Sequence, residues 1–293
     1  MKKTLFFCLC LILQISIAFA QNKKTKSPKI IFNDNNDPIR ASWIAQVEKT
    51  GESWLVKLHD KGNVLQEEIQ FKDEKLSVKE GEYKRYKAGK LYLKGNYVNN
   101  NKEGLWHYFD SDGRLSEEVS YSNSIYHGNR TTFWPNEKIK RIERYVNGYL
   151  HGPSNLYHQN GALASQQSYV KSIIQAPSKF MDEQGAPIDS AKILNSLDYN
   201  GGPLSFYRDM SFLLPNIFPI LHQKDIKDIT FYFVLRFSPE GIIEDVELMN
   251  LPNLKIQKAF YTSFRKIKKP AFFKEFGEPI PNALGLPLRF FTP

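Results

Sequence analysis

The side chains best placed for metal chemistry recur at one spacing along the chain. His127 and His151 lie 24 residues apart, and Glu80 and Glu103 hold the equivalent place in earlier copies of the same pattern. If the copies stack, these residues form a column that could suit zinc. The alternative is a turn residue that hydrogen-bonds to its neighbour. We favour the turn residue because a metal site needs three or four converging ligands, and we predict no metal and no cofactor.

A second group could supply acid and base catalysis. Four carboxylates fall within nine positions: Asp110, Asp112, Glu117 and Glu118. A catalytic pair would need a cleft in which the two pKa values are pushed apart, whereas a flat array of hairpins offers solvated faces. Ser154 and Ser165 lack the turn that exposes a nucleophilic serine. We therefore expect no catalytic residues and a protein that is not an enzyme.

These residues belong to a stretch in which one short pattern is written four times. The pattern opens on a glycine and ends on a tyrosine, with a turn between two alternating runs. Its fixed positions are Gly81, Gly104, Gly128 and Gly152, and Tyr97, Tyr121, Tyr145 and Tyr169. A constant period of this size indicates stacked units, and each unit reads as one β-hairpin. A single hairpin cannot bury its apolar face, so residues 81–170 are predicted to form a continuous array that serves as scaffold.

The motif Gly-x-Trp/Tyr-x-x-Tyr/Phe, with a Gly-bearing turn and a later Tyr, resembles MORN repeats. The closest likeness is the bacterial MORN-variant class, whose members are often labelled as antitoxin components. A less regular copy precedes it within residues 41–80, which we expect to form capping strands. One unit departs from the pattern, with Glu137 where the turn glycine stands elsewhere. The resemblance implies binding or spacing.

The amino terminus reads as an export signal. Lys2 and Lys3 precede an apolar run, and Ala18-Phe19-Ala20 forms a cleavage site before Gln21. The run is short for a bilayer span of about 20 residues, so we expect no transmembrane span after processing. Residues 21–40 are predicted to be a disordered leader. The protein is thus expected in the periplasm or outside the cell.

Charge and cysteine content narrow the class of protein. Removing the two lysines of residues 1–20 lowers the net charge from +9 to +7. Both cysteines, Cys8 and Cys10, lie in the signal, so no disulfide or cysteine-based metal site is expected. The sequence shows no nucleic-acid-binding motif, and an exported chain meets little nucleic acid. We predict no nucleic acid as a partner.

After a predicted linker over residues 171–198, the pattern changes to that of a mixed α+β domain. A helix is expected to start at Gly201-Gly202-Pro203, strands over 229–237 and 243–249, a second helix after Asn253, and a closing strand over 284–291. This order, with the stretch from Phe233 to Val246, resembles the TonB C-terminal domain over residues 199–293. The inner-membrane anchor and Pro-rich spacer of energy-transducing members are missing from the pattern.

That resemblance implies capture of an extended segment along a sheet edge. The predicted partner-binding residues are those of the closing strand: Leu284, Leu286, Leu288, Arg289 and Phe290. Strand addition supplies main-chain hydrogen bonds, while alternate side chains select the partner. We therefore predict a non-enzymatic adaptor that binds envelope proteins. The alternative is an envelope hydrolase that holds glycan on the aromatic face of the array.

Overall fold

The structure is a computed structural model that describes residues 43–189 without a break and separate stretches between residues 196 and 291. The predicted signal and leader lie outside the described residues. None of the helices described is long and apolar enough to cross a membrane.

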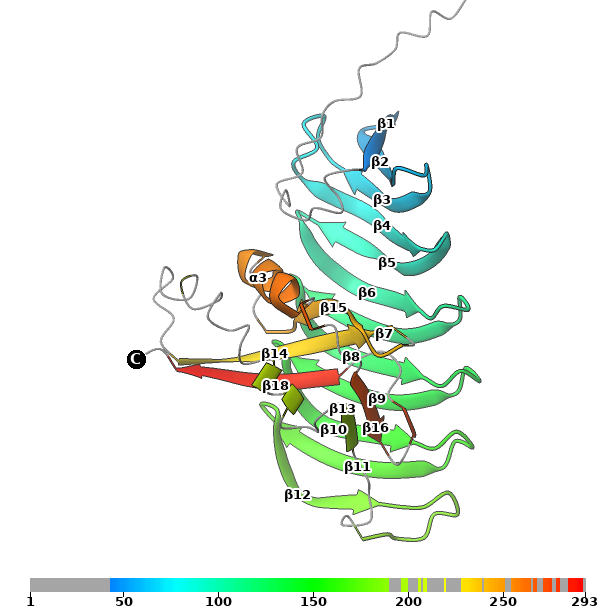
Figure 1. Ribbon diagram of the computed structural model, residues 1–293, viewed down its shortest axis with the longest axis vertical. Helices are drawn as coiled ribbons and strands as arrows, with labels where there is room; N and C mark the ends of the chain where they lie inside the picture. Colours follow the sequence, from blue (N-terminus) through cyan, green and yellow to red (C-terminus); the bar gives the residue numbers. More distant parts are fainter. Residues whose placement is uncertain are drawn as a thin grey trace, which may run out of the picture.

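Twelve consecutive strands form one antiparallel sheet, in which each strand pairs with the next along the chain (Figure 1). The strands are β1 (Ile44–Thr50), β2 (Ser53–His59), β3 (Leu65–Phe71), β4 (Lys79–Lys87), β5 (Lys90–Val98), β6 (Asn101–Phe109), β7 (Leu115–Ser122), β8 (Ile125–Phe133), β9 (Ile139–Val146), β10 (Tyr149–Tyr157), β11 (Leu163–Val170) and β12 (Ile173–Phe180). The prediction of a stacked hairpin array is confirmed. The region expected to hold capping strands, residues 41–80, supplies β1 to β3 and the start of β4.

From β5 to the end of the array, two kinds of turn alternate. On one side, two-residue connections such as Asn99-Asn100 place both residues at positive φ, here 47° and 70°. This is the turn whose twist suits a tight hairpin, and it favours asparagine. On the other side, a longer turn ends on a left-handed residue: Gly113, Glu137, Gly161 or Gly185. Glu137 adopts φ 63°, so the unit that departs in sequence keeps the same turn.

The array continues past residue 170, its predicted end. β12 pairs with β11 from Val170–Ile173 to Ser165–Phe180. Its closing turn at Gly185 lies 24 residues after Gly161. The prediction that residues 171–198 form a linker is therefore wrong for residues 173–180. Their alternation is hard to recognise because most β12 side chains are exposed.

One face of the array, here called the inner face, carries a continuous run of ring contacts. Tyr97 lies 5.2 Å from Trp106, and Trp106 lies 5.8 Å from Tyr121, measured between ring centroids. Tyr121 in turn lies 5.0 Å from Tyr126, and Tyr126 lies 5.3 Å from Tyr145. Each hairpin therefore packs its aromatic side chains on the next, as the period predicts.

The described residues between 196 and 291 form a smaller unit, here called the C-terminal unit. Its sheets have the orders β15-β14-β18 and β13-β16-β17. The elements are β13 (Ser196–Tyr199), β14 (Asp228–Phe237), β15 (Ile243–Leu248), α3 (Leu254–Phe264), β16 (Ala271–Glu275), β17 (Glu278–Pro279) and β18 (Leu284–Phe291). The expected strand pair, second helix and closing strand are observed. Of the helix expected after Pro203, four residues are described, and all four are helical.

Strand β14 is buried on both faces. On one face Phe233 packs on Phe260 of α3, with ring centroids 4.3 Å apart. On the other face Tyr232 contacts Tyr149 of the array, and Val234 belongs to the apolar core of the array. The C-terminal unit thus lies against the middle strands of the array (Figure 1).

Candidate functional site

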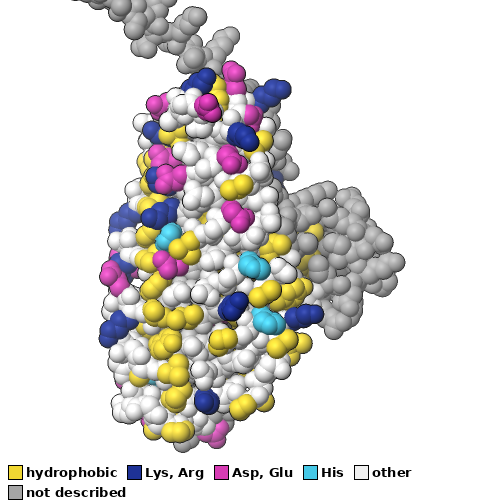
Figure 2. Space-filling model, turned by 180° about the vertical axis from the view of Figure 1, so that it is seen from behind, with side chains coloured by type: hydrophobic (Ala, Val, Ile, Leu, Met, Phe, Trp, Pro, Cys, Tyr) yellow, Lys and Arg dark blue, Asp and Glu magenta, His cyan; other side chains and the backbone are white. Residues whose placement is uncertain are grey.

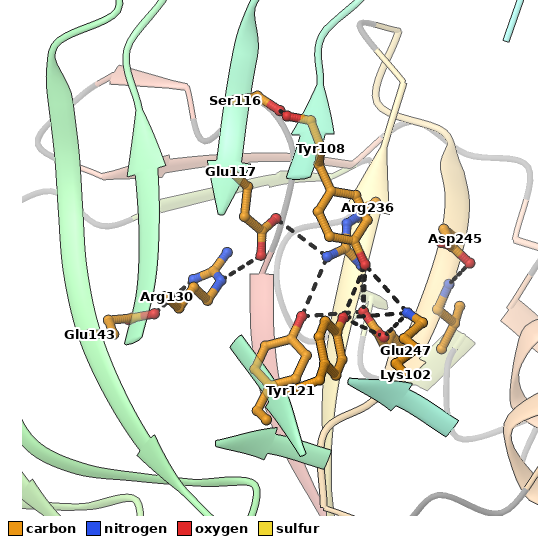
Figure 3. A network of polar contacts seen from close by, with 12 residues as sticks. Lys102, Tyr108, Ser116, Glu117, Tyr121, Arg130, Glu143, Arg236, Asp245 and Glu247 are labelled. Carbon is orange, nitrogen blue, oxygen red and sulfur yellow. Dashed lines mark hydrogen bonds and ion pairs between the residues drawn. The ribbon is translucent and has the colours of Figure 1, made fainter. Parts of the chain in front are cut away.

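Charged and hydroxyl side chains converge where the C-terminal unit meets the inner face of the array (Figure 3). Arg236 of β14 and Glu247 of β15 form an ion pair, with Nη1 3.1 Å from Oε2. Glu247 lies opposite Val234 in the strand pair, so Arg236 and Glu247 are diagonal neighbours on one face. Both are buried. The unit therefore presents a fixed cation and carboxylate to the array.

Three strands of the array hold the guanidinium of Arg236. Its Nη2 lies 3.3 Å from Oε2 of Glu117 and 3.4 Å from the hydroxyl of Tyr126. The group also lies over the ring of Tyr108, 3.9 Å from its centroid. An arginine so placed combines an ion pair, a hydrogen bond and a cation–π contact away from water.

The ion pairs continue into the array. Arg130 lies 2.7 Å from Glu117 through Nε and 2.7 Å from Glu143 through Nη1. The hydroxyl of Tyr145 donates to Glu143 at 3.1 Å. Cations and carboxylates thus alternate from Arg236 to Glu143, so that each buried charge has a partner of opposite sign.

Glu247 accepts hydrogen bonds from four array side chains. Lys102 Nζ and the Tyr121 hydroxyl lie 2.5 and 2.7 Å from Oε1. The hydroxyls of Tyr108 and Tyr126 each lie 3.2 Å from Oε2. One carboxylate of the C-terminal unit thereby joins β6, β7 and β8.

The pKa directions show which groups are charged. Burial alone raises the pKa of Glu247, but Lys102, Arg236 and the hydrogen bonds it accepts lower that pKa to about 2. For Glu117, burial is likewise outweighed by Arg130 and Arg236, and its pKa is lowered. Burial holds the pKa of Tyr121 well above its usual value. The carboxylates are therefore ionised acceptors and the tyrosine is a neutral donor. The network is suited to holding two parts together rather than to proton transfer near neutral pH.

The repeat register explains how the array supplies these charges. Each charged residue stands one repeat after an apolar one: Glu117 after Leu93, Arg130 after Trp106, and Glu143 after Val119. Inner-face positions that are apolar in one unit are thus charged in the next. Arg130, Glu143, Arg236 and Glu247 were not predicted as site residues. For Arg130 and Glu143, a charge at an apolar repeat position is a readable signal.

Main-chain contacts complete the interface. The amide of Tyr126 donates to the carbonyl of Met249 at 3.3 Å. A Cβ at Gly148 would lie 2.3 Å from the same carbonyl. This glycine also has φ 79°, so both the turn and the close approach of the C-terminal unit require it. At the rim, Lys87 pairs with Glu244.

The column predicted from the 24-residue spacing is a set of turn residues. The side chains of Glu80, Glu103 and His127 accept from the amides of Asn99, Asn123 and Asn147, at 2.8, 2.9 and 3.5 Å. No cluster of three or more potential metal ligands occurs among the residues that the structure describes. The favoured interpretation, a turn residue that bonds its neighbour, is confirmed for these three.

The structure separates the predicted carboxylate cluster. Asp110 accepts from the amides of Asp112 and Arg114 and shapes its own turn. Glu118 lies 3.4 Å from His107 on the opposite face from Glu117. Glu117 alone joins the network.

The two serines weighed as nucleophiles are buried in the array. Ser154 accepts from Arg141 at 3.3 Å, and Ser165 lies opposite Leu156 in the pairing of β10 with β11.

The predicted partner-binding strand is β18. It pairs with β14 along its whole length, with Leu286 opposite Phe233, Leu288 opposite Phe231 and Arg289 opposite Thr230. Among the described residues β18 has no second strand neighbour, so it is an edge of its sheet. The side chains of Leu284, Leu286, Leu288, Arg289 and Phe290 are outside the description.

Comparison with known proteins agrees with the repeat. The family model described as "MORN repeat variant" matches residues 126–147 and 150–171. These segments begin in β8 and at β10 and cover two consecutive hairpin units. The comparison with curated proteins finds no match.

Solved structures give only distant similarity. A TarM mutant from S. aureus, in complex with fondaparinux, alpha-GlcNAc-glycerol and UDP, is 15% identical, with a TM-score of 0.28 over 38% of this chain and 21% of that one. Another TarM structure is 16% identical, with a TM-score of 0.27 over 37% and 20%. A GtfA/B complex bound to UDP and GlcNAc is 16% identical, with a TM-score of 0.17 over 44% and 24%. The similar part spans no more than about a quarter of those chains.

Proposed function

We propose that the protein is an exported, non-enzymatic binding protein of the cell envelope, periplasmic or secreted. The array is the scaffold, and the C-terminal unit captures an envelope protein by strand addition at β18. The observation that carries this proposal is the strand order β15-β14-β18. The array contacts β15, at one edge of this sheet, and β18 forms the other edge.

The β15 side of the sheet is occupied by contacts within the chain. Glu244 pairs with Lys87, Glu247 with Lys102, and the carbonyl of Met249 accepts from Tyr126. A partner strand adding there would have to displace these contacts. Among the described strands β18 pairs only with β14, and this supports it as the edge that receives a partner.

The alternative of an envelope hydrolase has less support. The one predicted acid that joins a converging cluster, Glu117, is buried and paired with both Arg130 and Arg236. A general acid needs a raised pKa and access to substrate. The ion pairs lower the pKa of Glu117 instead.

One further part of the proposal rests on sequence resemblance. The C-terminal unit is proposed to be related to the TonB C-terminal domain. An antitoxin role is not proposed, because an exported chain would leave the compartment in which a cytoplasmic toxin acts.

Export is tested by the amino terminus of the protein recovered from envelope fractions. Mass spectrometry should find a terminus at or near Gln21. Recovery of intact residues 1–20 in the membrane fraction would contradict export with processing.

Strand addition is tested by site-specific photo-crosslinking in cells. A photo-reactive residue at Arg289 of β18 should crosslink to an envelope protein, and the same residue at Ser168 of the array should not. The full-length protein is used because a fragment of residues 199–293 would expose Tyr232, Val234 and Arg236, which the array covers. Equal crosslinking at both sites, or crosslinking from Ser168 alone, would overturn recognition by β18.

A further inference from the structure

The face of the array opposite the C-terminal unit, here called the outer face, carries an apolar stripe. Near the connecting turn of four hairpins an aromatic residue faces an aliphatic one across the strand pair. The pairs are Tyr86 with Leu91, Phe109 with Leu115, Phe133 with Ile139, and Tyr157 with Leu163. Figure 2 shows hydrophobic side chains in a line that follows the array on this face.

A β-bulge at the same place in each of the four hairpins explains why the stripe recurs from unit to unit. The strand register shifts immediately before Tyr86, Phe109, Phe133 and Tyr157. Such bulges aim a side chain at a fixed place. Tyr86 donates to Glu68 at 2.8 Å, and Lys94 lies over the ring of Phe109. Ile139 is 41% exposed, so solvent reaches the stripe.

The distance between side chains of the stripe on successive strands sets the repeat length of a polymer that could bind along it. Successive strands are about 4.8 Å apart, so aromatic residues recur about every 9.6 Å, with an aliphatic residue between them. Aromatic and aliphatic side chains therefore alternate along the stripe, one on each strand. A linear polymer of alternating units, each advancing by about one strand step, would match it.

The flank of the stripe is nearly uncharged from β8 to β11, and five of its eight positions carry an amide or a hydroxyl group. Its paired positions are Thr131 with Ile142, Asn129 with Arg144, Asn155 with Gln166, and Pro153 with Ser168. Arg144 is the single charge at these eight positions. Gln166 donates to Asn155 at 3.4 Å. Amide and hydroxyl groups beside an apolar row complement a ligand with apolar faces and neutral polar edges.

We propose that this outer stripe binds an extended glycan strand of the cell wall. Sugar rings offer C–H faces to the aromatic and aliphatic platforms, and their hydroxyl and acetamido groups meet the amides beside them. A β-1,4-linked strand of two alternating amino sugars has the two-unit repeat that the stripe displays. The site is separate from β18, so its failure would leave strand addition untouched.

The test is co-sedimentation of the purified exported protein with isolated peptidoglycan sacculi. Salt at about 0.5 M suppresses attraction that depends only on the basic net charge. The protein should sediment with sacculi and much less with cellulose, which lacks the alternation and the acetamido groups. Phe133→Ala combined with Ile139→Ser should weaken binding at least about tenfold, while Val98→Ala, an exposed apolar residue away from the stripe, should change nothing.

Loss of fold is controlled in two ways. Circular dichroism must show the strand signal of each variant unchanged, and Ile139→Lys alters the stripe at a position already exposed to water. That variant should also weaken sedimentation. Absence of sedimentation, equal sedimentation of all variants, equal affinity for cellulose, or binding to a proline-rich peptide in place of sacculi would each overturn the proposal.

Discussion

Two neighbouring parts of the inner face are built from the same repeat positions with different chemistry. Around β5 and β6 the positions hold Leu93, Trp106 and, one strand further, Val119, all buried among rings. One repeat later the same positions hold Glu117, Arg130 and Glu143, equally buried but paired as ions. The first part packs among its own neighbours, whereas in the second part Glu117 pairs with Arg236 of the C-terminal unit.

The apolar part provides stability to the stacked hairpins, whereas the ionic part provides specificity for the position of the C-terminal unit. Apolar stacking holds any hairpin on any other, because the hydrophobic effect has no direction. A chain of alternating ions accepts only a partner that presents a cation and a carboxylate at the right places, and it penalises every other arrangement. The array thus uses rings to stack and ions to fix one position of the C-terminal unit.

The largest effect is expected from removing the cation at the centre of the ionic part. Arg236→Met leaves Glu117 and Glu247 buried without one of their partners and should lower the free energy of unfolding by about 3 to 5 kcal/mol. Denaturation in urea measures it. The control is Lys87→Ala at the rim pair, where the lysine is 51% exposed and a loss of about 0 to 1 kcal/mol is expected. Equal losses for the two variants would remove the distinction between buried and rim pairs.

The apolar part is tested at Tyr121, whose ring packs between Trp106 and Tyr126. Its hydroxyl donates to Glu247, so Tyr121→Phe, which keeps the ring, separates the two contributions. Tyr121→Ala should cost about 2 to 4 kcal/mol, as for other large side chains removed from a core. Tyr169→Ala should cost less because Tyr169 is only partly buried. An unchanged melting temperature for Tyr121→Ala would mean that the rings do not stack the array.

Acid should weaken the ionic part. The pKa of Glu247 falls from 4.5 to about 2 on folding, so its contribution is complete above about pH 5 and is lost as the pH falls toward 2. The difference corresponds to about 3 kcal/mol. Unfolding free energies measured between pH 7 and 2 should fall in this window for the wild type. In Glu247→Gln the fall should be smaller, and a fall of the same size in both would contradict the assignment.

A smaller loss of stability is expected at Gly95, where the backbone lies closest to a ring of the apolar part. A Cβ at Gly95 would lie 2.2 Å from the ring of Trp106, and the rigid ring cannot easily move. Gly95→Ala should cost about 1 to 3 kcal/mol in urea denaturation. Gly62→Ala is the control, since its new methyl group would meet the side chains of Asp60 at 3.3 Å and Val64 at 4.0 Å. It should change stability by less than about 0.5 kcal/mol.

Much of the fold follows from sequence because the signals are local. The 24-residue period predicts the hairpins, and alternation along residues 229–237 predicts β14. β12 was missed because it contacts one neighbour and buries almost nothing, so its residues are free to vary from the pattern. Arg236 was not predicted as a site residue because its partners in the array, Glu117 and Tyr126, lie more than 100 positions away. Spacing along the chain does not reveal which strand will cover which face.

The central claim is that Arg236 and Glu117 bind the C-terminal unit to the array through direct interaction. A double-mutant cycle with Arg236→Met and Glu117→Gln measures the coupling. We predict a coupling free energy of about 1 to 3 kcal/mol, because each single change strands a buried charge that the double change removes. Additive effects of the two substitutions, with coupling indistinguishable from zero, would contradict the claim.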